Sequence, residues 1–583
     1  MELQDEDGHP HPSIERRTVR KLDLILLPFL SLLFLVNSLD RSNIGNAETA
    51  NFTRDAGLQP EDLNAAVAWF FVFFVALQPL GAAAGRKFGM SKWVPSVMTL
   101  WGVCTVLHVW VRKRWQLILL RIVIGTLESG FYPTAVSYLS LFYTRYEFGR
   151  RLGLFYGSYG IAGALGGIIA FAVFSKFPSD DGKSTDGSAA ADGWKSWQIL
   201  FLIEGLLTIV IALVGFFWLP HSAGTAWFLS PEERKCAEQR VLADRSGDGA
   251  TKGPGDILPA EELSEDAASH SEQDEQRRRL LSDEPPLARI RSTSEPSALT
   301  SDAGLTRQEI LSTVLFFPLI VPILILNIAS AIPSTAFSVF LPLVLSSLKL
   351  SSPVHSNILT APPFLLASIT LYMFTHWSDK SRQRIIPILA SLGIIMLGLV
   401  LTLLLSSSSI SSGRAIALYI SLCILLGGSF IPSPLTVAWY AGNIPDPGKR
   451  AIVLGINGYG NLAGVFAALI FPPRWQEDGY RPSFLITLGF VVVSSIGYMA
   501  LRTVLLLINK ARVKTAARLA AMDVDGEQIP VNSGIRIPAF AVVGGKWWDT
   551  QVRYWFGKRL LRMDGNEIYV RQGDEVLTFE YGL

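Results

Sequence analysis

Residues 118 to 138 read ILLRIVIGTLESGFYPTAVSY, a stretch apolar enough to cross a bilayer that nevertheless carries Arg121 and Glu128. A charged side chain at the centre of a membrane helix costs about 2.5 to 3.5 kcal/mol on insertion scales, so two of them require a compensating role. Their spacing places both on one face of a helix. That face either satisfies itself through an ion pair between helices or lines the path of a polar solute.

The composition of the 583-residue chain is that of a polytopic membrane protein, because 50% of the residues are hydrophobic and only 17% are charged. A net charge of +2 gives no indication of a nucleic-acid partner. The three cysteines and seven histidines are scattered and suggest neither a disulfide framework nor a metal site. A polar start followed by a long apolar run predicts a retained first span and no cleaved signal peptide.

Apolar runs of about 20 residues predict about twelve membrane-spanning helices in two groups of six. The expected fold class is an all-α polytopic membrane protein built from two six-helix bundles. Pro322, Pro333 and Pro342 predict a kink or a break in the seventh span. The expected spans are 22–40, 64–84, 93–111, 116–139, 150–173, 198–219, 312–345, 356–376, 385–406, 414–436, 451–471 and 483–507.

An acidic, serine-rich stretch separates the two groups of spans and contains too little apolar sequence to fold alone. It predicts a largely disordered linker at 221–306 between an N-terminal bundle at 22–220 and a C-terminal bundle at 307–508. An N-terminal arm at 1–21 and a C-terminal tail at 509–583 complete the expected organisation.

The loops on one side of the expected spans are rich in Lys and Arg, which marks the cytoplasmic side and puts both termini and the linker there. The loop at 112–114 is basic on the opposite side and disagrees with this orientation. The opposite loops are otherwise acidic, and Asn51 in the string Asn-Phe-Thr is a candidate external glycosylation acceptor. The basic clusters that agree lie at 16–21, 86–92, 145–151, 380–384, 449–450 and 510–514.

The two halves contain a faint internal repeat. RRLGLFYGSYGIAGALGG from Arg150 and RAIVLGINGYGNLAGV from Arg450 match at a shift of 300 residues, and each opens the fifth span of its half. The shared glycines allow helices to approach closely. The repeat indicates either duplicated bundles, as in secondary transporters, or ordinary membrane packing.

Two loops resemble signatures of the major facilitator superfamily. The string Gly81-x-x-x-Gly85-Arg86-Lys87-x-Gly89 is similar to the loop G-x-x-x-D-R-x-G-R that follows the second span in that family, but Gly85 replaces the usual acid. The second half contains a similar loop at 378–384. The resemblance implies two six-helix bundles around a central cavity.

A narrower resemblance, over about residues 20 to 510, is to the anion:cation symporter family and its fungal allantoate permease branch, which includes carriers for nicotinate, pantothenate and biotin. The chain departs from that branch in the second span, where it reads LQPLG at 77–81. The matching strings are LDRSNIGNA at 39–47, Arg121-x-x-x-Gly125-x-x-Glu128-Ser129-Gly130-x-x-Pro133, LIEG at 202–205 and the segment 443–450.

A carrier of organic anions needs a fixed cation for the carboxylate and a titratable acid for the coupling proton. The resemblance implies that Asp40 and Glu128 are the proton-coupling acids and that Arg41 binds the carboxylate. Arg121 either binds substrate or positions Glu128. The alternative for Asp40 and Arg41 is an ion pair at the membrane edge, and we expect Glu204 to be structural.

Polar residues in other spans are further candidates for substrate binding. Asn457 and Asn461 lie on adjacent turns of a glycine-rich span, where a hydrogen bond between helices is an equal alternative. Asn327 in the seventh span and Tyr156 in the fifth are weaker candidates.

The sequence therefore predicts a monomeric membrane carrier of a fungal plasma membrane that takes up a small organic anion together with protons. The proton gradient supplies the driving force, and neither a cofactor nor an enzymatic activity is expected. The first alternative is an exporter or proton antiporter of a drug-like compound or secondary metabolite. The second is a nontransporting nutrient sensor with the same fold.

Overall fold

The computed structural model describes residues 12–177, 194–245, 319–348, 352–406, 412–444 and 447–522, and no strand occurs among them. Eleven helices are long and apolar enough to cross a membrane. A further pair, α4 (Pro60–Ala76) and α5 (Gln78–Phe88), is bent by 53° and makes a twelfth span if counted as one. The expected all-α polytopic fold is confirmed.

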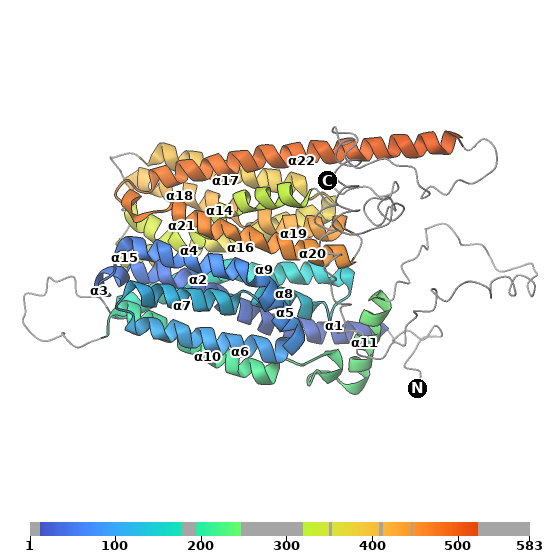
Figure 1. Cartoon of the computed structure of the whole chain (residues 1–583), viewed down its shortest axis with the longest axis horizontal. Coiled ribbons are helices and arrows are strands. Elements are labelled where there is room, and N and C mark those ends of the chain that lie inside the picture. The colour runs from blue at the N-terminus through green and yellow to red at the C-terminus, as the bar shows by residue number, and fades with distance from the viewer. Residues whose placement is uncertain are drawn as a thin grey trace, which may run out of the picture.

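The helices form two groups that lie side by side along the long axis in Figure 1. The remaining spans of the first group are α2 (Leu27–Glu48), α6 (Met90–Leu107), α7 (Arg114–Glu128) with α8 (Phe131–Leu139), α9 (Arg145–Lys176) and α10 (Ser196–Trp218). The second group consists of α14 (Ile320–Ser347), α16 (Ala361–Ser381), α17 (Ile385–Leu405), α18 (Ser412–Ser429) with α19 (Pro432–Asn443), α20 (Pro447–Asn457) with α21 (Ala463–Ile470), and α22 (Arg481–Met522).

Short helices distinguish the two ends of the molecule (Figure 1). One end, which we call the α3 end, carries α3 (Phe52–Asp55) and α15 (Pro353–Ile358). The opposite α11 end carries α1 (Pro12–Lys21) and α11 (Pro231–Arg245). The first described residues and the end of α22 thus lie at the same end, as an even number of spans requires.

The seventh span differs from its prediction, because α14 runs without a break through Pro333 and Pro342. A proline removes one backbone donor and leaves the carbonyl four residues earlier without its helical partner. The Thr335 hydroxyl donates to the nearby carbonyls of Ala331 and Ile332, at 2.9 and 3.1 Å. The predicted break was wrong, the predicted kink stays a prediction, and the expected start at 312 lies outside the described residues.

Helices also extend into three segments outside the expected bundles. The polar arm is helical from Pro12 and leads directly into the first span, and the expected linker contains α11. The last helix continues to Met522, beyond the expected end of the bundle at 508, and projects from the α11 end in Figure 1. The rest of the linker, 246–306, and the tail from 523 lie outside the described residues.

The two bundles are joined at the α3 end. Asn357 donates from Nδ2 to the Thr49 hydroxyl at 2.8 Å, and Asn64 donates from Nδ2 to two carbonyls of the other bundle, Ala468 and Phe471, each at 2.7 Å. The basic loop that disagreed with the predicted orientation lies here as well, where Arg114 pairs with Asp62 at 3.1 Å.

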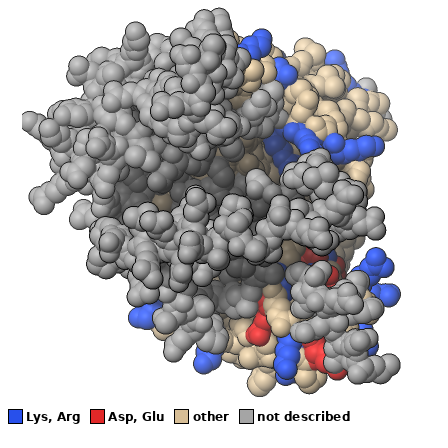
Figure 2. Space-filling view, turned by 90° about the vertical axis from the view of Figure 1, so that its right-hand side faces the viewer, with Lys and Arg blue, Asp and Glu red and all other residues tan. Residues whose placement is uncertain are grey.

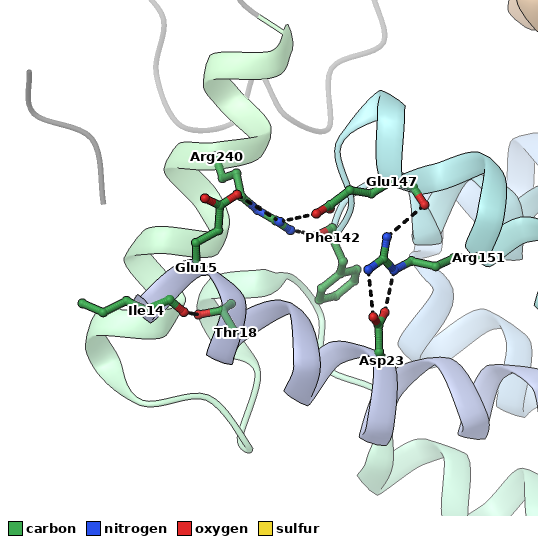
Figure 3. Close-up of polar contacts among 8 residues, drawn as sticks. All are labelled: Ile14, Glu15, Thr18, Asp23, Phe142, Glu147, Arg151 and Arg240. Carbon is green, nitrogen blue, oxygen red and sulfur yellow. Dashed lines mark hydrogen bonds and ion pairs between the residues drawn. The ribbon is translucent and has the colours of Figure 1, made fainter. Parts of the chain in front are cut away.

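At the α11 end, ion pairs tie α1 and α11 to α9 (Figure 3). Arg151 holds Asp23 through two nitrogens at 2.5 and 2.8 Å. The side chain of Arg240, which is 7% exposed, reaches both Glu147 at 2.9 Å and Glu15 at 3.5 Å. Figure 2 looks onto this end, where Lys and Arg lie around the edge of the described surface and Asp and Glu gather in its lower part.

Candidate substrate and proton site

The centre of the N-terminal bundle holds an ion pair between α2 and α7. Arg41 Nε lies 3.2 Å from Glu128 Oε2, and the two side chains are 11% and 0% exposed. The other carboxylate oxygen of Glu128 has no partner. Glu128 is the last residue of α7, directly before the Ser129–Gly130 interruption that separates α7 from α8. Both side chains are therefore buried, and Glu128 lies in the middle of the apolar stretch Arg114–Leu139.

Aromatic side chains surround Arg41. Its guanidinium carbon lies 4.6 Å from the ring centroid of Phe74 and 6.0 Å from that of Phe70, distances typical of cation–π contacts. Tyr156 interacts electrostatically with Arg41 and packs against Tyr132, with ring centroids 6.2 Å apart. The arrangement gives the site one cationic group within an aromatic wall.

Asp40 and Arg121 form the second part of the site. Thr105 donates its hydroxyl to Asp40 Oδ1 at 3.3 Å, while Asp40 Oδ2 has no partner. Arg121 Nη1 donates to the backbone carbonyl of Asp40 at 3.4 Å, and its Nε has no partner. Both side chains are buried. The structure thus brings together the four charged residues that the sequence singled out.

Glu204 belongs to the same cluster, although the sequence predicted a structural role for it. It is 2% exposed, neither carboxylate oxygen has a partner, and it interacts electrostatically with Asp40 and Arg121. A carboxylate that holds helices together is hydrogen-bonded, whereas Glu204 is not. The sequence feature that could have identified Glu204 as a site residue is its position eight residues into the strongly apolar run that begins at Ser196.

The candidates in the C-terminal bundle form a neutral pair. Asn327 donates from Nδ2 to Asn457 Oδ1 at 3.0 Å, and its own Oδ1 has no partner. Asn461 instead donates to the Gly458 carbonyl of its own helix at 2.9 Å. Asn51, the glycosylation candidate, lies at the α3 end in a left-handed conformation directly before α3.

Gln78 was not predicted as a site residue, yet it lies where two irregular spans meet. It follows the bend between α4 and α5, and it faces the 3₁₀ turn Gly458–Leu462 that interrupts the eleventh span. A Cβ on Gly458 would lie 2.6 Å from Gln78 Oε1, so the Gln78 side chain lies directly against this turn. Gln78 Oε1 is buried without a partner. Interrupted helices whose backbone lines a cavity are typical of transporter sites.

A polytopic protein of two helix bundles, with buried charges in one and an interrupted span in each, is a member of the transporter class. The family model of the Major Facilitator Superfamily matches residues 30–469, and the chain belongs to that superfamily.

Curated relatives are fungal transporters. The chain is 28% identical to the major facilitator-type transporter hxnP of Emericella nidulans over 528 residues, which cover 88% of this chain and 92% of hxnP. It is 25% identical over 495 residues to the high-affinity nicotinic acid transporter of Saccharomyces cerevisiae, covering 84% and 78% of the two chains.

Solved transporters share the fold. A D-xylose–proton symporter superposes with a TM-score of 0.54 at 13% identity, covering 81% of this chain and 96% of the symporter. An inward-facing bacterial homologue of the lysosomal transporter Spinster superposes with a TM-score of 0.51 at 14% identity, covering 82% and 96%.

Proposed function

We propose that this protein is a proton-coupled symporter of a small organic anion, a carrier of the kind found in the anion:cation symporter family and its allantoate permease-like branch. The observation that carries the proposal is the buried pair of Arg41 and Glu128. An arginine fork binds a carboxylate through two parallel hydrogen bonds, and Glu128 occupies one donor of that fork, Arg41 Nε, when no substrate is present. Substrate and Glu128 therefore compete for the same cation.

The competition couples the anion to a proton. When the substrate carboxylate takes Arg41, Glu128 loses its counter-charge in a buried site, where an unpaired carboxylate is strongly disfavoured. Glu128 then takes up a proton, and the occupied site is again neutral. Asp40, beside Arg121, is the second acid of the coupling machinery. A substrate that binds one relative arrangement of the two bundles better than the other shifts the equilibrium toward that arrangement.

The walls of the site indicate the substrate class. Phe70 and Phe74 flank Arg41, and the ring of Tyr159 meets that of Phe430 across the two bundles, with centroids 5.3 Å apart. Flat aromatic surfaces around one cation favour a compact, planar carboxylate, such as nicotinate. The relative named as a nicotinic acid transporter supports the same class.

The charged ends support the proposed orientation. The Lys and Arg at the edge of the α11 end favour a cytoplasmic location for that end, where the first described residues and the end of α22 lie. The bundles are joined at the α3 end by Asn64 and Asn357, which is the external side in this orientation. The structure then corresponds to a carrier closed toward the outside. We propose that it acts as a monomer in the plasma membrane.

The test is uptake of labelled nicotinate, pantothenate, biotin, allantoate and short dicarboxylates by cells that express the chain, at pH 5 and pH 7.5, with and without a protonophore. The proposal predicts saturable uptake of one acid that is greater at pH 5 and abolished by the protonophore. Arg41→Gln is the matched negative control. Lowered retention of preloaded acid, with no uptake by a correctly localised protein, would contradict symport and indicate an exporter.

A further inference from the structure

We infer that Glu204 is a third proton-carrying acid of the site, and that it shares one resident proton with Asp40 when no substrate is bound. The inference deepens the proposed symport and depends on that function for its role in transport. It stands on the position of Glu204, on its unpartnered oxygens and on the balance of charge in the cluster.

Close packing of α6 against α10 sets the position of Glu204. A Cβ on the neighbouring Gly205 would lie 2.6 Å from Val106 Cγ2 and 2.9 Å from the Gly102 carbonyl oxygen, so only glycine allows this approach. Thr105, on the same turn of α6, donates its hydroxyl to Asp40. The crossing therefore brings Glu204 to the level of Asp40, and α2 packs against α10 as well.

Helices α2, α6 and α9 and the 3₁₀ turn His108–Trp110 pack against α10. Of their titratable and polar groups, α2 carries Asp40, and α6 carries Cys104 and Thr105. The 3₁₀ turn His108–Trp110 contributes His108, whose Nδ1 lies 2.8 Å from the Cys104 carbonyl oxygen and whose Nε2 has no partner. Helix α9 carries its charged residues only near its two ends.

Arg121 is the cation that acts on Glu204. It belongs to α7 and interacts electrostatically with Asp40, Glu128 and Glu204. One guanidinium thus acts on three carboxyl groups, of which Glu128 already has Arg41 as its ion-pair partner. Asp40 and Glu204 are left with Arg121 alone.

The balance of charge requires a proton. Two ionised carboxylates beside a single arginine leave one uncompensated negative charge, and such a charge costs several kcal/mol in a buried site. Two acids in this position titrate as a pair, and one of them stays protonated. The unpartnered oxygens, Asp40 Oδ2 and both oxygens of Glu204, are where a shared proton is held.

The resident proton makes the empty site neutral before substrate arrives. A monocarboxylate that enters then adds one negative charge, and the proton that Glu128 accepts cancels it. The proposal therefore gives the acids different states in the empty site: the Asp40–Glu204 pair holds one resident proton, and Glu128 is ionised until the anion arrives.

Infrared difference spectroscopy of the purified full-length protein, without substrate at pH 7.5, tests the inference. The probe is the carbonyl-stretch band of a protonated carboxylic acid, recorded in H₂O and D₂O. The inference predicts that Glu204→Gln removes a band equivalent to about one acid group. Glu233→Gln is the matched control, because Glu233 is an ion-paired glutamate outside the spans; this variant keeps the band.

Asp40→Asn gives an independent check that does not require the Glu204 variant to fold. Without the Asp40 carboxyl, Glu204 has Arg121 to itself and ionises, so this variant loses the same band. An unchanged band in both variants would overturn the inference. The measurement needs no transported substrate, so a failure here leaves the uptake test of the proposed symport unaffected, and a failure of uptake leaves this result standing.

Discussion

The spans of the N-terminal bundle bury Asp40, Arg121, Glu128 and Glu204, whereas the polar side chains buried among the described residues of the C-terminal bundle are all neutral. Asn327 and Asn457, joined by a hydrogen bond, are the corresponding pair there. Charges inside a membrane protein are expensive and mark ion or proton pathways, while amides contribute hydrogen bonds at lower cost. The comparison indicates that buried charges are concentrated in one bundle, and we propose that the other supplies neutral contacts to the substrate.

Removal of the anion-binding cation has the largest expected effect. Arg41→Gln should lower uptake by at least about 100-fold, because loss of one partner from a buried charge pair costs roughly 2 to 5 kcal/mol. Arg41→Lys keeps the charge but loses the planar fork, so uptake should fall to an intermediate level. Initial rates with the acid that the panel identifies measure both. Equal uptake by wild type and Arg41→Gln would place the anion site outside the N-terminal bundle.

Loss of a coupling acid should separate exchange from accumulation. Glu128→Gln mimics the protonated acid, so the variant should exchange labelled for unlabelled substrate at rates near wild type. It should not concentrate substrate against its gradient, because no proton travels with it. Asp40→Asn should behave in the same way. Accumulation by either variant, measured in proteoliposomes with an imposed pH gradient, would show that the acid in question does not couple transport.

The neutral bundle should affect substrate affinity more than coupling. Asn457→Ala leaves Asn327 without its acceptor, and an unsatisfied buried amide costs roughly 1 to 3 kcal/mol, or about 5- to 150-fold in KM. Asn461→Ala is the matched control, since Asn461 bonds only a carbonyl of its own helix among the described contacts, and KM should stay within about twofold. A changed pH dependence in Asn457→Ala would contradict the division between the bundles.

The smallest expected effect concerns the contact between α1 and α11. Although burial alone would raise the pKa of Glu233, hydrogen bonds from Lys21 and the Ser230 N–H bring that pKa below its ordinary value of 4.5. A lowered pKa stabilises the folded state above pH 4.5, and the contribution is lost as the pH falls through the lower, folded value. Glu233→Gln should therefore lower the Tm by about one degree at pH 7 and by less at pH 4. A larger decrease in Tm at pH 4 than at pH 7 would contradict the lowered pKa of Glu233.

The loop after the second span and the loop after the eighth span also differ between the two halves. In the second half Arg384 pairs with Asp379 at 2.5 Å. In the first half Gly85 stands at the acid position, and a Cβ there would collide with the Thr134 side chain. The substitution noticed in the sequence is thus explained by close packing of α5 against α8.

The general architecture could be predicted because it depends on local features of the chain. Apolar runs of bilayer length specified the spans, and the spacing of Arg121 and Glu128 placed both on one face of α7. The break that prolines allowed in α14 did not occur, since the helix is continuous through Pro333 and Pro342.

Partners within the site could not be predicted, since they come from spans far apart in the sequence. The spacing on α7 placed Arg121 and Glu128 on one face but did not identify their partners. In the structure Glu128 instead pairs with Arg41 of α2, and Arg121 turns toward Asp40. Glu204 is separated from Asp40 by most of the N-terminal bundle in sequence, so only the packing of α6 against α10 reveals their proximity.

Proton uptake on substrate binding tests the central claim most directly. The purified protein, in weakly buffered detergent solution with a pH indicator, is mixed with the acid that the uptake panel identifies. Competition between substrate and Glu128 for Arg41 predicts that wild type takes up about one proton for each anion bound and that Glu128→Gln binds the anion without proton uptake. Binding to wild type with no change in proton concentration would contradict the account.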